Sequence, residues 1–128
     1  MSPADDPTIG DDVPLWRRIP PDQLRVDDET GEAGASDSAF RTEQMSVYLA
    51  PLTDLQAVLT NYSGHKVMEF SAGGARREGF IIVRAPLPTD PSHALVLRRD
   101  NPGQRPTKSQ AKRLANHARW VTGDTRGV

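Results

Sequence analysis

Residues 67–83 read Val-Met-Glu-Phe-Ser-Ala-Gly-Gly-Ala-Arg-Arg-Glu-Gly-Phe-Ile-Ile-Val, and this stretch decides the fold class. Residues 67–70 and 80–83 are short runs rich in β-branched and aromatic side chains, which predicts two strands. Residues 72–78 between them favour a short helical turn despite the Gly73-Gly74 pair. A helical turn between two strands indicates a domain that contains both element types.

Further elements are predicted on both sides of this stretch. Residues 13–19, 45–49 and 93–97 have strand composition, and Pro20-Pro21 ends the first of these runs. Thr53 with Gln56 and Thr107 with Gln110 are capping-box pairs, which predict helices over 52–60 and from 108 to about Val121. The residues of the second helix that we expect to face the core are Ala111, Leu114, Ala115, Ala118 and Val121.

The prediction is therefore an α+β fold in a single small domain. We expect a mixed, curved sheet of about five short strands with two helices, and the C-terminal helix packed on the sheet. A chain of 128 residues fits one domain, which we assign to residues 13–122. Residues 1–12 are predicted to be a disordered acidic arm, 27–37 a long polar loop, and 123–128 a frayed tail.

Composition excludes several classes of function. The chain has no cysteine, so it has neither disulfides nor thiolate metal sites. The three histidines are not at metal-ligand spacing, and no phosphate-loop or nucleotide motif is present, so we expect no metal and no cofactor. No signal peptide and no run of about twenty apolar residues is found. We therefore expect a cytoplasmic protein without membrane contact.

The charge distribution predicts where an anionic partner binds. Residues 1–44 contain eleven acids and four Lys/Arg, whereas residues 98–128 contain two acids and eight Lys/Arg. Basic residues on one helix face with an aromatic nearby suit phosphates and stacked bases. The predicted binding residues are Arg98, Arg99, Arg105, Lys108, Lys112, Arg113, Arg119 and Trp120. We expect a nucleic acid or an acidic protein as the partner; an ordinary solvated helix face is the alternative.

Four short segments are distinctive: Leu-Trp-Arg-Arg-Ile-Pro-Pro at 15–21, Ser-Asp-Ser-Ala-Phe at 36–40, Met-Ser-Val-Tyr-Leu-Ala at 45–50 and Pro-Ser-His-Ala at 91–94. Together they resemble a group of small bacterial proteins of no established function. Their order is also similar to that of the RES-type NAD-degrading toxins, which have an ADP-ribosyltransferase-like fold. That resemblance implies a nucleotide site at Arg17 or Arg18 and Tyr48, although the chain lacks that family's Gly-Arg-Trp and its helix glutamate.

Two alternatives to a binding module follow. An enzyme acting on a nucleotide such as NAD would use a polar pocket formed by Arg17, Ser38, Tyr48 and His93, with the imidazole as general base. An internal ion pair of Arg17 and a structural hydrogen bond of His93 are the alternatives for those side chains. A third class is a component of a bacterial conflict system that acts through protein contact alone. The charge separation and the lack of a specific catalytic motif favour a small binding or accessory module over an enzyme.

Overall fold

The computed structural model describes residues 3–26, 33–35, 37–42 and 44–121. These residues form an antiparallel six-stranded sheet in the order β6-β7-β4-β1-β5-β8 and a small antiparallel pair, β2 with β3. The strands of the sheet are β1 (Pro14–Ile19), β4 (Met45–Leu49), β5 (Lys66–Ser71), β6 (Phe80–Arg84), β7 (His93–Arg98) and β8 (Arg119–Val121). The pair consists of β2 (Leu24–Val26) and β3 (Ala33–Ala35).

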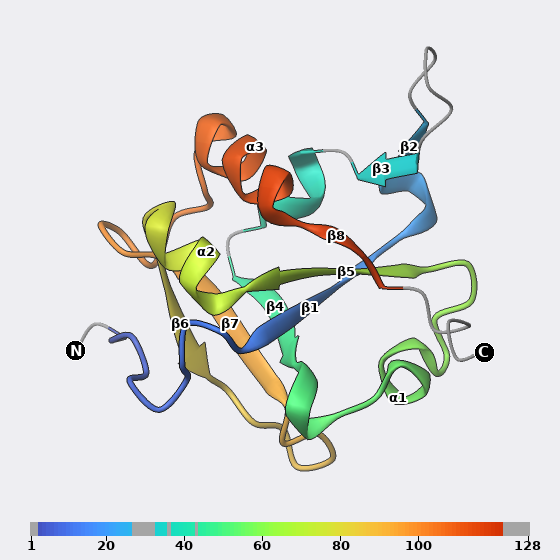
Figure 1. The fold of residues 1–128 in the computed structure, drawn as a ribbon, viewed down its shortest axis with the longest axis horizontal. Coiled ribbons are helices and arrows are strands. Elements are labelled where there is room, and N and C mark those ends of the chain that lie inside the picture. The colour runs from blue at the N-terminus through green and yellow to red at the C-terminus, as the bar shows by residue number, and fades with distance from the viewer. Residues whose placement is uncertain (1–2, 27–32, 36, 43, 122–128) are drawn as a thin grey trace.

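Helices cover both faces of the sheet, as Figure 1 shows. The helix α2 (Ala72–Arg77), the helix α3 (Lys108–His117) and the 3-10 turn η2 (Asp37–Phe40) lie over one face, and the helix α1 (Leu55–Leu59) lies over the other. Two further 3-10 turns are η1 (Pro21–Gln23) and η3 (Ala50–Leu52). The α+β class and the packing of the C-terminal helix on the sheet are confirmed.

The main core lies between the sheet and the α2–α3 layer. Phe40, Phe70 and Phe80 are fully buried in it, together with Ala111 and Leu114 of α3. A smaller apolar cluster lies under α1 and consists of Tyr48, Val58 and Val67 with neighbours that pack against them. Successive residues of a strand point to opposite faces, so a strand between the two layers supplies side chains to both clusters.

The first predicted helix begins later than its capping pair indicates. Asp54, not Thr53, is the N-cap, because its carboxylate accepts the backbone N–H of Ala57 at 2.8 Å. Residues 50–52 form the turn η3 instead of the first helical turn, with Pro51 inside it. The helix therefore has five residues.

The C-terminal helix is shorter than predicted. It ends at His117, and Arg119–Val121 form β8, which pairs with β5 through Trp120 opposite Met68. Val121 packs against the cluster under α1, on the sheet face away from α3. The helical spacing of the alanines continues to Ala118, but pairing with β5 satisfies the backbone groups as a helical turn would, and it also packs Trp120 and Val121 against the two apolar clusters. Gly123 and the predicted tail lie outside the described residues.

The N-terminal segment also differs from the prediction of a disordered arm. Ile9 is 2 % exposed and belongs to the main core. The backbone N–H of Asp6 donates to the carbonyl oxygen of Ile82 at 2.8 Å, and the Asp5 carboxylate accepts the N–H of Ile82 at 2.9 Å. Residues 3–12 therefore cover the outer edge of β6, because one apolar anchor and several ordered polar contacts offset the entropy of the acidic segment.

Part of the predicted long loop at 27–37 lies outside the described residues. Residues 33–35 and 37, which the prediction places in the loop, belong to other elements. Residues 33–35 are strand β3, and Leu24–Val26 pairs with it across the undescribed stretch. Asp37 then opens the turn η2.

Candidate anion-binding site

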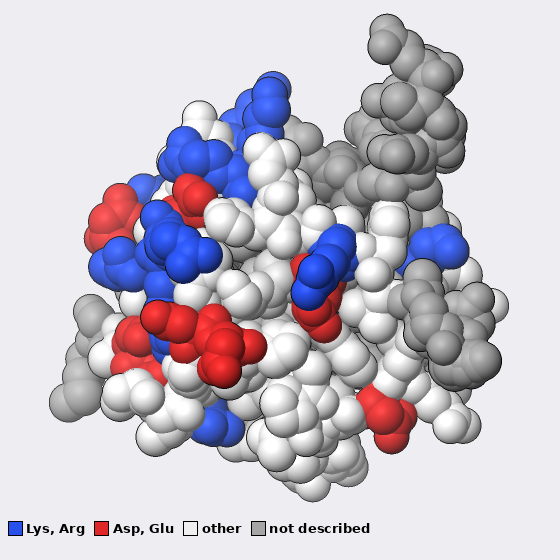
Figure 2. All heavy atoms as spheres, in the orientation of Figure 1, with Lys and Arg blue, Asp and Glu red and all other residues white. Residues whose placement is uncertain are grey.

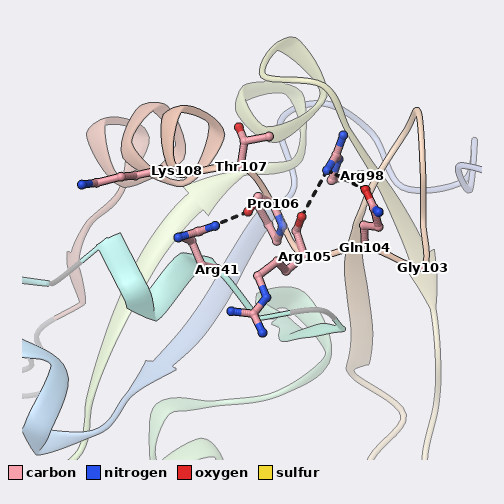
Figure 3. Close-up of a pocket in the computed structure, with 8 residues that line it drawn as sticks. All are labelled: Arg41, Arg98, Gly103, Gln104, Arg105, Pro106, Thr107 and Lys108. Carbon is pink, nitrogen blue, oxygen red and sulfur yellow. Dashed lines mark hydrogen bonds between the residues drawn. The ribbon is translucent and has the colours of Figure 1, made fainter.

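A hollow of about 460 Å³ lies where the loop after β7 meets the start of α3. It is lined by Arg41, Arg98, Gly103, Gln104, Arg105, Pro106, Thr107 and Lys108. Four of these eight residues carry a positive charge and none is acidic. Figure 3 shows that they come from three places: Arg41 from the segment after η2, Arg98 from the end of β7, and the others from the loop and α3.

The start of α3 is held in place by its N-cap. The hydroxyl of Thr107 accepts the N–H of Gln110 at 3.1 Å, and the Gln110 side chain accepts the N–H of Thr107 at 3.0 Å. This is the capping box that the sequence predicts. Lys108 and Ser109 open the helix, where backbone N–H groups have no partner inside the helix. The positive end of the helix therefore adds to the charge of the hollow.

Arg41 is fixed against the loop by its own side chain. Its Nε–H donates to the carbonyl oxygen of Pro106 at 3.2 Å, as Figure 3 shows. Pro106 is buried, so its carbonyl has few other partners. Within the described residues, this bond leaves the two terminal amino groups of the guanidinium without a partner. Sequence reasoning missed Arg41, because nothing near it in the chain indicates a contact with residue 106.

Arg98 lines the hollow but its charge is compensated. Its guanidinium pairs with both carboxylate oxygens of Asp100, at 3.0 and 2.7 Å. The hydrogen bond with Asp100 raises the pKa of Arg98, and the same bond lowers the pKa of Asp100. Arg98 also donates to the carbonyl of Arg105 and to the side chain of Gln104, both at 3.3 Å. Its role is to shape the loop that carries Arg105.

Charge compensation separates the predicted binding residues into two groups. Arg113 pairs with Glu78 at 2.9 Å and Arg119 pairs with Glu69 at 3.3 Å. The side chains of Arg105, Lys108 and Lys112 are exposed and make no hydrogen bond or ion pair within the described residues. Figure 2 shows the same pattern more widely: basic atoms gather over α3 and α2, acidic atoms gather over the N-terminal segment, and the two kinds adjoin over β5 and β8.

We call Arg41, Arg105, Lys108 and Lys112 the basic patch. Lys108 and Lys112 are one turn apart on the same helix face, about 6 Å along the axis.

Two of the predicted binding residues lie outside the patch. The side chain of Arg99 donates to the carbonyls of Arg76 and Phe80, at 3.0 and 3.1 Å. Trp120 lies in β8, half-buried against the main core, and not on α3 as predicted.

In the described part of the N-terminal segment, three acids pair with arginines outside the basic patch. Arg76 of α2 pairs with Asp5 at 3.1 Å and with Asp11 at 2.7 Å, and Arg84 of β6 pairs with Asp6 at 3.1 Å. These acids thus compensate the positive charges of the arginines on α2 and β6. None of the carboxylates described compensates the positive charge of the patch.

The candidate catalytic residues take structural positions. Arg17 donates to the carbonyls of Ala39 and Ser46 at 3.1 and 2.8 Å and to the hydroxyl of Thr42 at 3.0 Å. It fills the space where β1 and β4 separate, since their pairing covers only residues 15–16 of β1. Burial lowers the pKa of Arg17 to about 10. Ser38 is exposed in η2.

Tyr48 and His93 lie on the other face of the sheet. Trp16 pairs with Tyr48 and Tyr48 pairs with His93, so these three share a face, and Arg17 points to the opposite one. His93 lies with Nδ1 2.8 Å from the carbonyl oxygen of Ala85 and with Nε2 3.1 Å from the hydroxyl of Ser46. A neutral ring with its proton on Nδ1 satisfies both bonds. Arg17 and His93 therefore do not converge on one site.

The guanidinium of Arg18 also contacts other parts of the protein. Its guanidinium donates to the carbonyl of Val58 at 2.9 Å and lies 3.4 Å from the ring centroid of Tyr62 and 5.2 Å from that of Tyr48. Such cation–π contacts stabilise the packing of α1 on the sheet. The adjacent arginines of β1 thus attach η2 to one face and α1 to the other.

Within residues 3–26, 33–35, 37–42 and 44–121, no group of three or more His, Asp or Glu side chains is placed to hold a metal ion. None of the helices described is long and apolar enough to cross a membrane. No family model matches the chain, and neither a curated protein nor a solved structure does.

Proposed function

We propose that this protein is a binding module that holds nucleic acid by its phosphate groups at the basic patch. The observation that carries the proposal is the contrast in charge compensation. Arg76, Arg84, Arg98, Arg113 and Arg119 each pair with a carboxylate, whereas Arg105, Lys108 and Lys112 pair with none in the described residues. Uncompensated like charges on one surface repel each other, and an anionic ligand removes that cost.

The composition of the hollow suits phosphate as the bound group. Guanidinium groups match the geometry of phosphate oxygens, and an ammonium group beside them adds a point charge. Arg41 and Arg105 supply the former and Lys108 the latter. None of the eight described residues that line the hollow is aromatic, so we expect no stacking of bases there and little preference for sequence.

The test is the salt dependence of binding to a fluorescein-labelled single-stranded oligonucleotide, measured by anisotropy between about 50 and about 200 mM salt. We expect Arg105→Ala with Lys108→Ala to bind more weakly and to flatten the slope of log K against log salt by about 0.7 per removed cation. The control is Lys66→Ala, because Lys66 is exposed, carries the same charge and does not line the hollow.

Two results would overturn the proposal. The first is an intact protein that does not bind at low salt, and the second is a double variant that binds like the parent. Tight binding of poly-glutamate would point to an acidic protein as the partner instead. Circular dichroism of each variant confirms that the fold is retained.

A further inference from the structure

The hollow offers more hydrogen-bond donors than a phosphate inside a nucleic-acid strand can use. Arg41 donates one of its five N–H groups to the carbonyl oxygen of Pro106. The side chains of Arg105 and Lys108 donate none to the described residues. Among the first-turn N–H groups of α3, those of Gln110 and Ala111 already bond to Thr107, so only those of Lys108 and Ser109 add to this set. An internal phosphodiester has two unbridged oxygens, whereas a terminal phosphate presents three strong acceptors. The donor count therefore fits the terminal group better.

The charge of the hollow indicates the same group. Of its four cations, Arg98 is compensated by Asp100, whereas Arg41, Arg105 and Lys108 pair with no carboxylate among the residues that the structure describes. A phosphodiester carries one negative charge, whereas a phosphate monoester carries about −1.5 to −2 at neutral pH. A group near two negative charges gains more from three cations in one hollow than a monoanion does.

The shape of the hollow suits the end of a chain. The loop formed by Gly103, Gln104 and Arg105 bounds it on one side and the start of α3 on the other, as Figure 3 shows. Its volume of about 460 Å³ lies in the range of small-ligand sites. That is room for a phosphate with part of its nucleoside. Lys112 lies one helical turn beyond the hollow, where a following phosphodiester would pass.

We infer that the hollow binds the terminal phosphate monoester of a nucleic-acid strand in preference to internal phosphodiesters. This inference rests on the proposed function and adds the chemical group that is recognised. Arg41, Arg105 and Lys108 hold the terminal phosphate. Lys112 contributes only general attraction to the strand.

The experiment compares one oligonucleotide sequence in three forms: 5′-phosphorylated, 3′-phosphorylated, and with hydroxyls at both ends. We expect a phosphorylated form to bind at least about tenfold more tightly than the hydroxyl form, because charge-assisted hydrogen bonds are among the stronger ones. Arg105→Ala with Lys108→Ala is expected to abolish this ratio. Lys112→Ala, the matched control on the same helix face, is expected to weaken binding of all forms alike and to keep the ratio.

The outcomes separate this inference from the proposed function. Equal affinity for phosphorylated and hydroxyl forms overturns the inference, and the proposed function stands if that binding still depends on salt and on the basic patch. Loss of the ratio in Lys112→Ala as well would also overturn it. Inorganic phosphate that competes as strongly as the phosphorylated oligonucleotide would assign the site to free phosphate instead. Preference for one phosphorylated end supports the inference and shows which end is bound.

Discussion

The Nε–H of Arg41 donates to the carbonyl oxygen of Pro106 at 3.2 Å, across 65 residues of sequence. This bond places a cation from the segment after η2 beside the loop that leads into α3. The loop in turn is shaped by Arg98, which donates to the carbonyl of Arg105. Two arginines thus organise the hollow, and only one of them, Arg98, has its charge compensated by a carboxylate in the described residues.

Replacing Arg41 tests whether it contacts the ligand. We expect Arg41→Gln to weaken oligonucleotide binding and to reduce the salt slope by about 0.7, since one phosphate contact is lost. Arg41→Lys retains the charge and is expected to restore the slope but not the full affinity, because the bond to Pro106 is lost. Lys66→Gln removes the same charge elsewhere and serves as the control. An Arg41→Gln protein with an unchanged slope would exclude Arg41 from the site.

Releasing a compensated cation on α3 is expected to strengthen binding. The Glu78 carboxylate accepts from Arg113 at 2.9 Å and lies 2.8 Å from Nε2 of His117. In Glu78→Gln the charge of Arg113, next to Lys112, is uncompensated. We expect tighter binding and a salt slope that is steeper by up to about 0.7. Glu69→Gln, which releases Arg119 on β8, is expected to have the smaller effect; the reverse order would contradict the placement of the ligand.

Gly73 is expected to be essential for docking of the N-terminal segment. A Cβ at this position would lie 2.8 Å from Cβ of Asp11 and 3.0 Å from its carbonyl oxygen. Gly73→Ala is therefore expected to lower the free energy of unfolding by about 1–3 kcal/mol despite the better helix propensity of alanine. Urea denaturation measures this. At Gly103 the nearest atom would be 3.8 Å away, so Gly103→Ala is expected to stay within about 0.5 kcal/mol of the parent.

The pKa of Asp6 reports the same docking. A hydrogen bond from the Thr8 hydroxyl, with a second from the Thr8 N–H, lowers the pKa of Asp6 below its ordinary value of 3.8. Ionised Asp6 therefore stabilises the folded segment at neutral pH, and this contribution is lost as the pH falls below about 3.8. We expect Thr8→Val to raise this pKa in an NMR titration. Thr60→Val, which removes a bond to a carbonyl, is expected to leave it unchanged, and no rise in Thr8→Val would contradict the assignment.

Local patterns in the sequence are sufficient to place most of the sheet. The strands at 45–49, 80–84 and 93–98 coincide with apolar runs, and the Thr107–Gln110 capping box marks the start of α3. The opposite directions of Arg17 and Arg18 follow from the period of a strand. Each of these features depends on residues close together in the chain.

Features that depend on distant partners were not predicted. Residues 118–121 continue a helical pattern, but β5 offers them a strand partner. The acidic composition of residues 3–12 indicates disorder, yet Ile9 is buried in the core and Arg76 forms ion pairs with Asp5 and Asp11. For the site, Lys108 and Lys112 were predicted from helix spacing. The ion pairs of Arg113 and Arg119 and the contact of Arg41 with Pro106 join residues far apart in the sequence, so only the tertiary structure shows them.

The central claim is that the basic patch is the binding surface, and a heteronuclear NMR titration with the phosphorylated oligonucleotide tests it most directly. The account predicts that the largest shifts fall on the amides of Arg41 and of residues 103–109, with smaller shifts at Lys112. Shifts confined to the Tyr62–Arg18 region under α1, with the loop before α3 unchanged, would contradict it.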